Sequence, residues 1–333
     1  MSFRPKLLVS AAVTIAAFTP SPAGATPQSA DPDPVLLASG LEGASGSGVG
    51  PGGALFVTEG AVGRVSRVDP RTGAVTTFAS GLPEAIAPIG GAIDVAFRGS
   101  TAYVLVTLVG PDVGGTDVVG IYRVDGPHSS TVIADIGAWA IANPPETQFD
   151  VPTGVQYALE TFRGGFLVTD GHHNRVLRVT LDGDVTEFIA FGNIVPTGLT
   201  ISGNTVFMAE AGPIPHLPED GKIVSFGPKS SGATEIASGA SLAVDVERGR
   251  GRDLYALAQG DWPLGGDPAS PALPNTGDLL MVDSDGTMTP IVVDGLDRPT
   301  SLEILQNTAY VVTLTGEIWK IDDISGPPHG RSR

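Results

Sequence analysis

The sequence contains no cysteine, which excludes disulfide bonds, thiolate nucleophiles and cysteine-ligated metals. Basic residues are also scarce, with 19 Lys and Arg against 36 Asp and Glu and a net charge of −17. This acidity argues against nucleic acids and anionic membrane surfaces as partners. After the first 25 residues, no stretch of the sequence is apolar over the length that a membrane span requires, so membrane insertion is not expected.

The first 25 residues have the pattern of a secretory signal peptide. A short basic start precedes an apolar core from Leu7 to Phe18, and Ala23-Gly24-Ala25 is typical of a cleavage site. We therefore expect a secreted protein that is cleaved after Ala25, with a linker over 26–33 and a C-terminal tail over 324–333. A secreted chain without disulfides must be held together by a large apolar core.

Short β-branched runs alternate with turn residues along the rest of the chain, which predicts an all-β fold. Segments such as "LLASG" and "TFASG" recur, and each interval between them has room for four short strands. They end at Gly40, Gly81, Gly137, Gly192, Gly239 and Gly295. After the last segment only three strands follow, whereas Pro34–Gly40 is a fourth strand with none before it. The N-terminal strand therefore completes the last sheet, and 34–323 is predicted to be a closed six-bladed β-propeller.

The third repeat, "GGFLVTDGHHNRVLRVTLDGDVTEFIA", resembles the NHL-type repeat, and two of the repeats begin with "PTG". Over residues 34–323 the chain resembles the ScyD/ScyE family of secreted propellers, which is named for a cyanobacterial pigment gene cluster. The resemblance implies a propeller fold and an exported setting. It carries over no catalytic residues, and a step in secondary metabolism is implied by the family name alone.

The long loops of the predicted propeller fall on one face. They are Val109–Val119, Ala138–Asp150, Ala211–Gly221 and Gly260–Gly277. The turns on the opposite face are short, so the long-loop face is predicted to bind a ligand. Trp139, Phe149 and Trp262 lie in these loops and could line the rim of a pocket.

A set of hydroxyl side chains is predicted where the innermost strands begin. Its members are Ser47, Thr153, Thr197, Ser241 and Thr300. These hydroxyls could satisfy backbone groups at the channel rim, and they would also line the route of any ligand into the channel.

Acids end several of the predicted second strands. They are Glu59, Asp170 and Glu210, with Asp261 just beyond the fifth. Carboxylates that converge on a channel mouth can hold Ca²⁺ or another divalent metal. Six-bladed lactonases of the gluconolactonase and paraoxonase types hold a metal in this region, but Thr-Gly stands here in place of their Asn-Gly strand starts. A structural role for Glu59 and Asp170 is the alternative.

The stretch "TDGHHNRVLRV" places His172 and His173 side by side. The first repeat has "TEGAVGRVSRV" at the same place, so the shared acid and arginines are predicted to brace the loop. Asn174 stands where the other repeats have glycine, which indicates a turn residue with positive φ. The histidines could form a metal or general-base site with His216 and Glu210, or they could be solvated loop residues.

Two functions remain open from the sequence. The first is a secreted binding propeller that takes a small molecule, a glycan or a protein on its long-loop face. The second is a metal-assisted hydrolase or lactonase at the channel mouth. The sequence "GPHSS" lacks the strand-turn-helix setting of a serine nucleophile, so serine hydrolase chemistry is not predicted.

Overall fold

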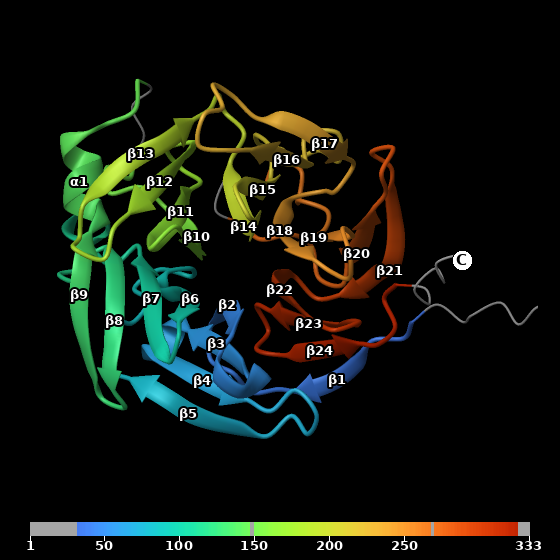
Figure 1. Ribbon diagram of the computed structural model, residues 1–333, viewed down its shortest axis with the longest axis horizontal. Helices are drawn as coiled ribbons and strands as arrows, with labels where there is room; N and C mark the ends of the chain where they lie inside the picture. The colour runs from blue at the N-terminus through green and yellow to red at the C-terminus, as the bar shows by residue number, and fades with distance from the viewer. Residues whose placement is uncertain (1–31, 147–149, 268–269, 326–333) are drawn as a thin grey trace, which may run out of the picture. The chain divides into compact units, whose positions relative to one another are not determined.

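The structure is a computed structural model that describes residues 32–146, 150–267 and 270–325. These residues form six four-stranded antiparallel sheets, arranged as blades around a central axis (Figure 1). The predicted six-bladed β-propeller is therefore confirmed. The predicted signal peptide and Phe149 lie outside the described residues. No helix in the described ranges is long and apolar enough to cross a membrane.

The first strand of each blade lies nearest the centre of the ring, and the last lies at its rim (Figure 1). The strands of blades one to three are β2 (Ala44–Val49), β3 (Leu55–Glu59), β4 (Arg64–Val68), β5 (Val75–Ser80), β6 (Gly91–Arg98), β7 (Thr101–Thr107), β8 (Gly120–Gly126), β9 (Ser129–Asp135), β10 (Gln156–Phe162), β11 (Gly165–Asp170), β12 (Arg175–Val179) and β13 (Val185–Ala190). The strands of blades four to six are β14 (Pro196–Ser202), β15 (Thr205–Glu210), β16 (Lys222–Phe226), β17 (Thr234–Ser238), β18 (Ala243–Arg248), β19 (Leu254–Ala258), β20 (Gly277–Val282), β21 (Met288–Leu296), β22 (Pro299–Leu305), β23 (Thr308–Thr313), β24 (Ile318–Ile321) and β1 (Val35–Ala38).

Blade six joins the two ends of the propeller. Its strand order is β1-β24-β23-β22, and β1 pairs antiparallel with β24. Val35 lies opposite Lys320 and Leu36 lies opposite Trp319. The N-terminal strand thus supplies the missing fourth strand, as the repeat pattern predicts, and blade six has four strands like the other five.

One element between blades two and three differs from the all-strand prediction. Helix α1 (Ile136–Ala142) follows β9 directly and includes Gly137, which the repeat pattern places at the end of a strand. The Asp135 carboxylate accepts a hydrogen bond from the Ala138 backbone at 2.7 Å and so caps the helix. A helix of seven residues is too short to show a helical period in the sequence.

All six innermost strands contain a bulge or register shift near their start. A bulge redirects the side chain that follows it. In blades two and five that residue is an aspartate, Asp94 or Asp245. In the preceding blade, a glycine lies beside each carboxylate, Gly46 beside Asp94 and Gly198 beside Asp245. A Cβ at either glycine would overlap the aspartate Oδ1, so a larger residue would not fit there.

These glycines give a direct test of the inter-blade packing. We expect Gly198→Ala to lower the free energy of unfolding by about 1–3 kcal/mol, because the added methyl group overlaps Asp245. Gly192→Ala is the matched control, since a Cβ there meets no atom within 4 Å. Thermal denaturation should distinguish the two variants. Equal stabilities would contradict this packing.

Candidate functional site

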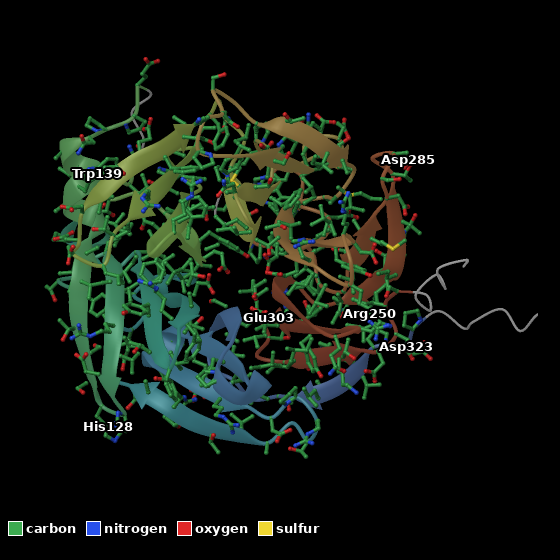
Figure 2. All side chains as sticks on the ribbon, in the orientation of Figure 1. His128, Trp139, Arg250, Asp285, Glu303 and Asp323 are labelled. Atoms are coloured by element: carbon green, nitrogen blue, oxygen red, sulfur yellow. The ribbon has the colours of Figure 1, made fainter. Side chains whose placement is uncertain are left out.

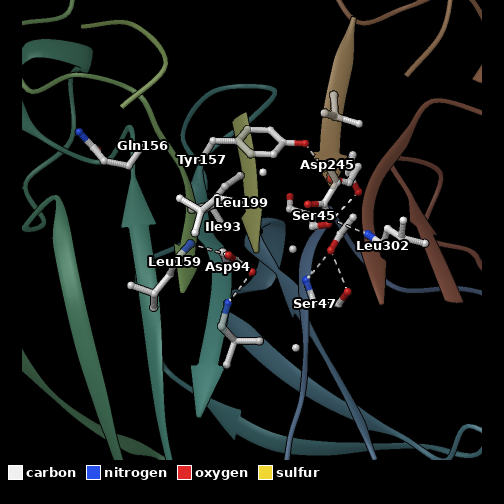
Figure 3. Close-up of a pocket in the computed structure, with 18 of the residues that line it drawn as sticks. Ser45, Ser47, Ile93, Asp94, Gln156, Tyr157, Leu159, Leu199, Asp245 and Leu302 are labelled. Carbon is white, nitrogen blue, oxygen red and sulfur yellow. Dashed lines mark hydrogen bonds between the residues drawn. The ribbon is translucent and has the colours of Figure 1, made fainter. Parts of the chain in front are cut away.

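The innermost strands surround a central cavity of about 550 Å³ (Figure 3). Pro88 and Ser270, from loops of the long-loop face, line one part of it. Phe97 and Thr161, next to the short turns, line another, so the cavity extends along the central channel. The volume lies in the usual range of small-molecule sites.

The charged residues of the cavity all have the same sign. Its lining includes five carboxylates and, among the described residues, no Lys, Arg or His. The five are Asp94, Glu160, Asp245, Glu247 and Glu303. They belong to the innermost strands of blades two, three, five and six. A buried group of ionised acids without a basic partner is electrostatically unfavourable, so these carboxyl groups either stay protonated or are balanced by the positive charge of a ligand.

The two aspartates link neighbouring blades in the same way. Asp94 accepts a hydrogen bond from the backbone of Leu159 in blade three at 2.7 Å, and Asp245 accepts one from Leu302 in blade six, also at 2.7 Å (Figure 3). Each also accepts from the backbone N–H of the next residue in its own strand. Burial nevertheless raises the pKa of Asp94 well above its ordinary value and that of Asp245 to about 7.

The three glutamates differ in their hydrogen bonds. Glu160 accepts hydrogen bonds from the backbone and hydroxyl of Thr161 at 2.7 and 2.9 Å. Glu247 accepts hydrogen bonds from the Thr200 hydroxyl at 3.2 Å and from the Arg248 backbone N–H at 3.1 Å. Glu303, which lies near the centre of the ring in Figure 2, has no hydrogen bond from another described residue. Burial and the neighbouring carboxylates raise the pKa of Glu247 and of Glu303 well above the ordinary value.

Tyr157 crosses the channel. It extends from β10 in blade three, and its hydroxyl donates to the backbone carbonyl of Thr300 in blade six at 2.7 Å (Figure 3). Blades three and six lie opposite each other in the ring, with two blades between them on either side. This bond therefore connects opposite walls of the channel. Burial, with Asp245 and Asp94 nearby, raises the pKa of the phenol well above its ordinary value. The Tyr157 side chain therefore extends across the cavity.

The predicted acid Glu59 forms an ion pair with Arg64 inside blade one. Its side chain is fully buried, and Arg64 donates to it through Nε at 2.9 Å and Nη2 at 2.6 Å. Ser66 and the Glu42 backbone also donate to it. Burial would raise the pKa of Glu59, but these hydrogen bonds outweigh it and hold the pKa below the ordinary value. Glu59 is thus not in the central cavity.

Asp170 is equally buried and faces the same kind of partner. Its Oδ2 lies 3.4 Å from Arg175 Nε and 3.0 Å from His173 Nδ1. Arg175 also donates to the Asn143 carbonyl at 2.8 Å and stacks on Trp139, 4.9 Å from the ring centroid. These contacts place His173 and Trp139 within one network that joins α1 to blade three.

His172 lies next to this network, with its ring 5.8 Å from that of His173. Burial and His173 lower the pKa of His172. Asn174 has a φ of 53°, as expected for a residue that replaces glycine at this turn. His128 bonds to Ser80 at 2.8 Å near the rim of the ring (Figure 2), and His329 lies outside the described residues.

His216 contacts blade five. Its Nδ1 lies 2.7 Å from the Gly212 carbonyl and 3.2 Å from the Ala211 carbonyl, so this nitrogen carries the proton. Its ring packs edge-on against Trp262 at 6.0 Å, and the Trp262 indole donates to Ser270 at 3.1 Å. Trp262 is buried among the side chains of the core rather than standing at an open rim.

Glu210 and Asp261, the other two predicted acids, do not line the central cavity. Glu210 is buried, and burial raises its pKa to about 7 although Lys222 opposes the shift. Lys222 itself bonds to Glu235 at 2.7 Å. Asp261 is exposed. Within the described ranges no three His, Asp or Glu side chains are placed to hold a metal ion. The predicted acids and histidines therefore do not form a common metal site there.

The sequence also predicts five hydroxyls around the channel mouth. Ser47 and Thr300 line the cavity, whereas Thr153, Thr197 and Ser241 do not. The Thr300 hydroxyl donates to the Ser45 carbonyl at 2.7 Å, and the Thr197 hydroxyl donates to the Ala243 carbonyl at 2.9 Å. Both bonds connect neighbouring blades, so these hydroxyls satisfy backbone groups.

Comparisons with known proteins identify the fold. No family model matches the sequence, and no curated protein matches it. A gluconolactonase from Xanthomonas campestris is similar in structure, with a TM-score of 0.60 and 13% identity over 87% of this chain and 89% of that one. A virginiamycin B lyase from Staphylococcus aureus has a TM-score of 0.54 and 14% identity over 87% and 98%.

A PQQ-bound aldose sugar dehydrogenase from Streptomyces coelicolor is similar too, with a TM-score of 0.57 and 14% identity over 86% and 96% of the two chains. At these identities the likeness establishes the fold alone. The similar structures are six-bladed propellers with different activities, so the function of this chain has to be inferred from its own residues.

Proposed function

We propose that this protein binds a small organic cation in its central channel. The observation that carries the proposal is the cavity of about 550 Å³ with five carboxylates and no described basic residue in its lining. A bound cation would supply the missing countercharge and favour the ionised form of each carboxyl group. This function narrows the predicted binding propeller to one chemical class of ligand.

The walls of the cavity favour an organic ligand over a single metal ion. Ile93, Leu159 and Leu199 line the cavity beside the carboxylates (Figure 3). The carboxylates come from four blades, and no three of the described ones are placed to hold a metal ion. A ligand with an apolar body and one or two ammonium groups matches both features, because apolar surface and charge are then both accommodated.

The long-loop face carries acidic residues that would attract such a ligand. Asp112, Asp117, Glu219 and Asp261 are exposed in its loops. Charge of one sign around a cleft raises the local concentration of ligands of the opposite sign. The chain is also acidic throughout, and secretion, if the signal peptide acts as the sequence predicts, would place this channel outside the cell.

An enzymatic role is the alternative, since a lactonase, a lyase and a dehydrogenase share this fold. The cavity offers carboxylates as general acids or bases, but its described lining includes no His or Lys. Binding is therefore the function that these side chains support best. Nothing in the geometry favours a glycan or a protein over the organic cation.

A series of ligands with one shape and increasing charge tests the proposal. We expect benzyl alcohol to bind least, benzylammonium more tightly and 1,3-bis(aminomethyl)benzene, a dication, most tightly, by about tenfold per charge. Isothermal titration calorimetry at about pH 8 measures the affinities, because this pH lies above the pKa of about 7 to which burial raises Asp245. Affinities that do not depend on ligand charge, or the absence of binding by the dication, would refute the proposal.

A further inference from the structure

The acidic wall of the central cavity repeats after three blades. The Leu159 backbone N–H of blade three donates to Asp94 of blade two at 2.7 Å. The Leu302 backbone N–H of blade six donates to Asp245 of blade five, also at 2.7 Å. A glycine of the preceding blade lies beside each aspartate. Blades two and three therefore present the same arrangement as blades five and six.

A glutamate directly follows the donating leucine in both arrangements, Glu160 in β10 and Glu303 in β22. Each glutamate lies two residues before the last paired residue of the first strand of its hairpin. We call Asp94 with Glu160 the first acid pair, and Asp245 with Glu303 the second acid pair. All four residues line the cavity.

The two acid pairs lie on opposite sides of the channel. Figure 1 shows β6 and β10 on one side of the ring centre, and β18 and β22 on the other. Blades that are three apart face each other in a ring of six, so the acid pairs are related by an approximate two-fold axis along the channel. Ile93 and Val244, which precede the two aspartates, also line the cavity. A ligand that reaches both walls therefore meets carboxyl groups at each end and apolar side chains beside them.

The second acid pair lies in the more acidic wall. Glu247 follows Asp245 by two residues on β18, whereas Ala96 holds the equivalent position of β6. Glu303 accepts no hydrogen bond from another described residue, whereas Glu160 accepts two. A single positive charge is therefore expected to bind at the second acid pair, and the first acid pair then still lacks a counter-ion.

We propose that the channel binds an α,ω-diammonium ion, with one ammonium group at each acid pair and the connecting chain between the two walls. This inference rests on the proposed function and narrows the organic cation to one with a charge at each end. An ammonium group has three N–H donors, and a carboxylate is the acceptor with which it forms its strongest hydrogen bonds. The apolar chain suits the aliphatic residues that precede the aspartates.

α,ω-Diamines from 1,4-diaminobutane to 1,8-diaminooctane are the probes, each compared with the monoamine of the same chain length. Calorimetry on the whole protein at about pH 8 is the measurement. We expect one chain length to fit best, and that diamine to bind about tenfold more tightly than its monoamine. If no diamine binds more tightly than its monoamine, the inference is overturned. If none of these amines binds, the proposed function is overturned as well.

Glu160→Gln separates the two ends of the ligand. The Glu160 Oε1 atom accepts both hydrogen bonds from Thr161, and glutamine keeps this oxygen, so the fold should be preserved. We expect the variant to weaken binding of the best diamine by about tenfold and to change binding of its monoamine by less than about twofold, because the monoamine binds at the second acid pair. Unchanged monoamine binding would also show that the variant is folded.

Two further variants complete the comparison. Glu303→Gln, in the second acid pair, should weaken binding of both ligands. Glu187→Gln, at an exposed position of β13 in the same blade as Glu160, removes a charge away from the channel and should leave both affinities unchanged. If Glu160→Gln weakens the diamine and the monoamine to the same extent, the two-ended assignment is wrong, whereas the proposed binding of an organic cation still stands.

Discussion

Replacing Glu247 and Glu303 by glutamine should make the protein more stable at about pH 8 and strongly weaken cation binding in the channel. Both carboxyl groups have pKa values raised by burial and by neighbouring acids, so their ionised forms repel one another in the folded state. Glutamine removes the charge and keeps the shape. We expect the free energy of unfolding to rise by about 1–2 kcal/mol, with screening by water in the channel limiting the gain.

The pH dependence of this effect follows from the direction of the shifts. Folding raises these pKa values, so the folded state holds more protons than the unfolded state between the two values. Their contribution to stability is therefore present at low pH and is lost as the pH rises through the folded pKa. The double variant should match the wild type at about pH 4 and exceed it at about pH 8, which thermal denaturation at both pH values measures.

Loss of binding together with a gain in stability is the pattern expected of a functional site, because charges kept for a ligand destabilise the free protein. Asp245→Asn is the contrasting variant. Its carboxylate accepts backbone hydrogen bonds from Leu302 and Val246, and an amide cannot accept both in the same geometry without placing its NH₂ group against a donor. Asp245→Asn should therefore be destabilising. A destabilised Glu247→Gln/Glu303→Gln variant at about pH 8 would show that these acids are structural.

Arg175→Met should lower the free energy of unfolding by about 3–5 kcal/mol. Arg175 and Asp170 are both almost fully buried, and the substitution leaves the Asp170 carboxylate without its arginine partner. It also removes the hydrogen bond to Asn143 and the stack on Trp139, which hold α1 against blade three. Chemical denaturation of the variant measures the loss.

A double variant separates charge from packing at this position. Asp170→Asn combined with Arg175→Met removes both charges, so it should be less destabilised than Arg175→Met alone. The same comparison tests the prediction that the acid and arginine of "TDGHHNRVLRV" brace the loop. A loss of less than about 1 kcal/mol for Arg175→Met would contradict a bracing role.

The architecture could be predicted because the sequence contains one repeat for each blade. Each blade must bury its own faces, so strands, turns and glycines recur, and the unmatched strand before Gly40 indicates how the ring closes. Helix α1 could not be predicted in this way, since it is too short to show a period and depends on the local cap from Asp135. The same comparison of repeats predicted that Asn174 replaces a glycine at a turn with positive φ, and the structure confirms a positive φ there.

The candidate site was harder to predict because it exists only in the closed ring. Glu59 and Asp170 stand out in the sequence as strand-ending acids, yet each is buried beside an arginine. Asp94, Asp245 and Glu303 instead lie within apolar strands of different blades, and only the ring brings them into one cavity. The available signal was an acid within an otherwise apolar innermost strand, as in "GGAIDVAF" and "ASLAVDV". A buried acid in such a strand indicates the channel more specifically than an acid at a strand end.

Proton release on cation binding tests the central claim most directly. Calorimetric titration of 1,3-bis(aminomethyl)benzene at about pH 7, in two buffers with different ionisation enthalpies, measures the number of protons exchanged. Because a cation lowers the raised pKa values in the channel, the account predicts net proton release by the wild type and much less by the Glu247→Gln/Glu303→Gln variant. Binding without proton release, or equal release by the variant, would contradict it.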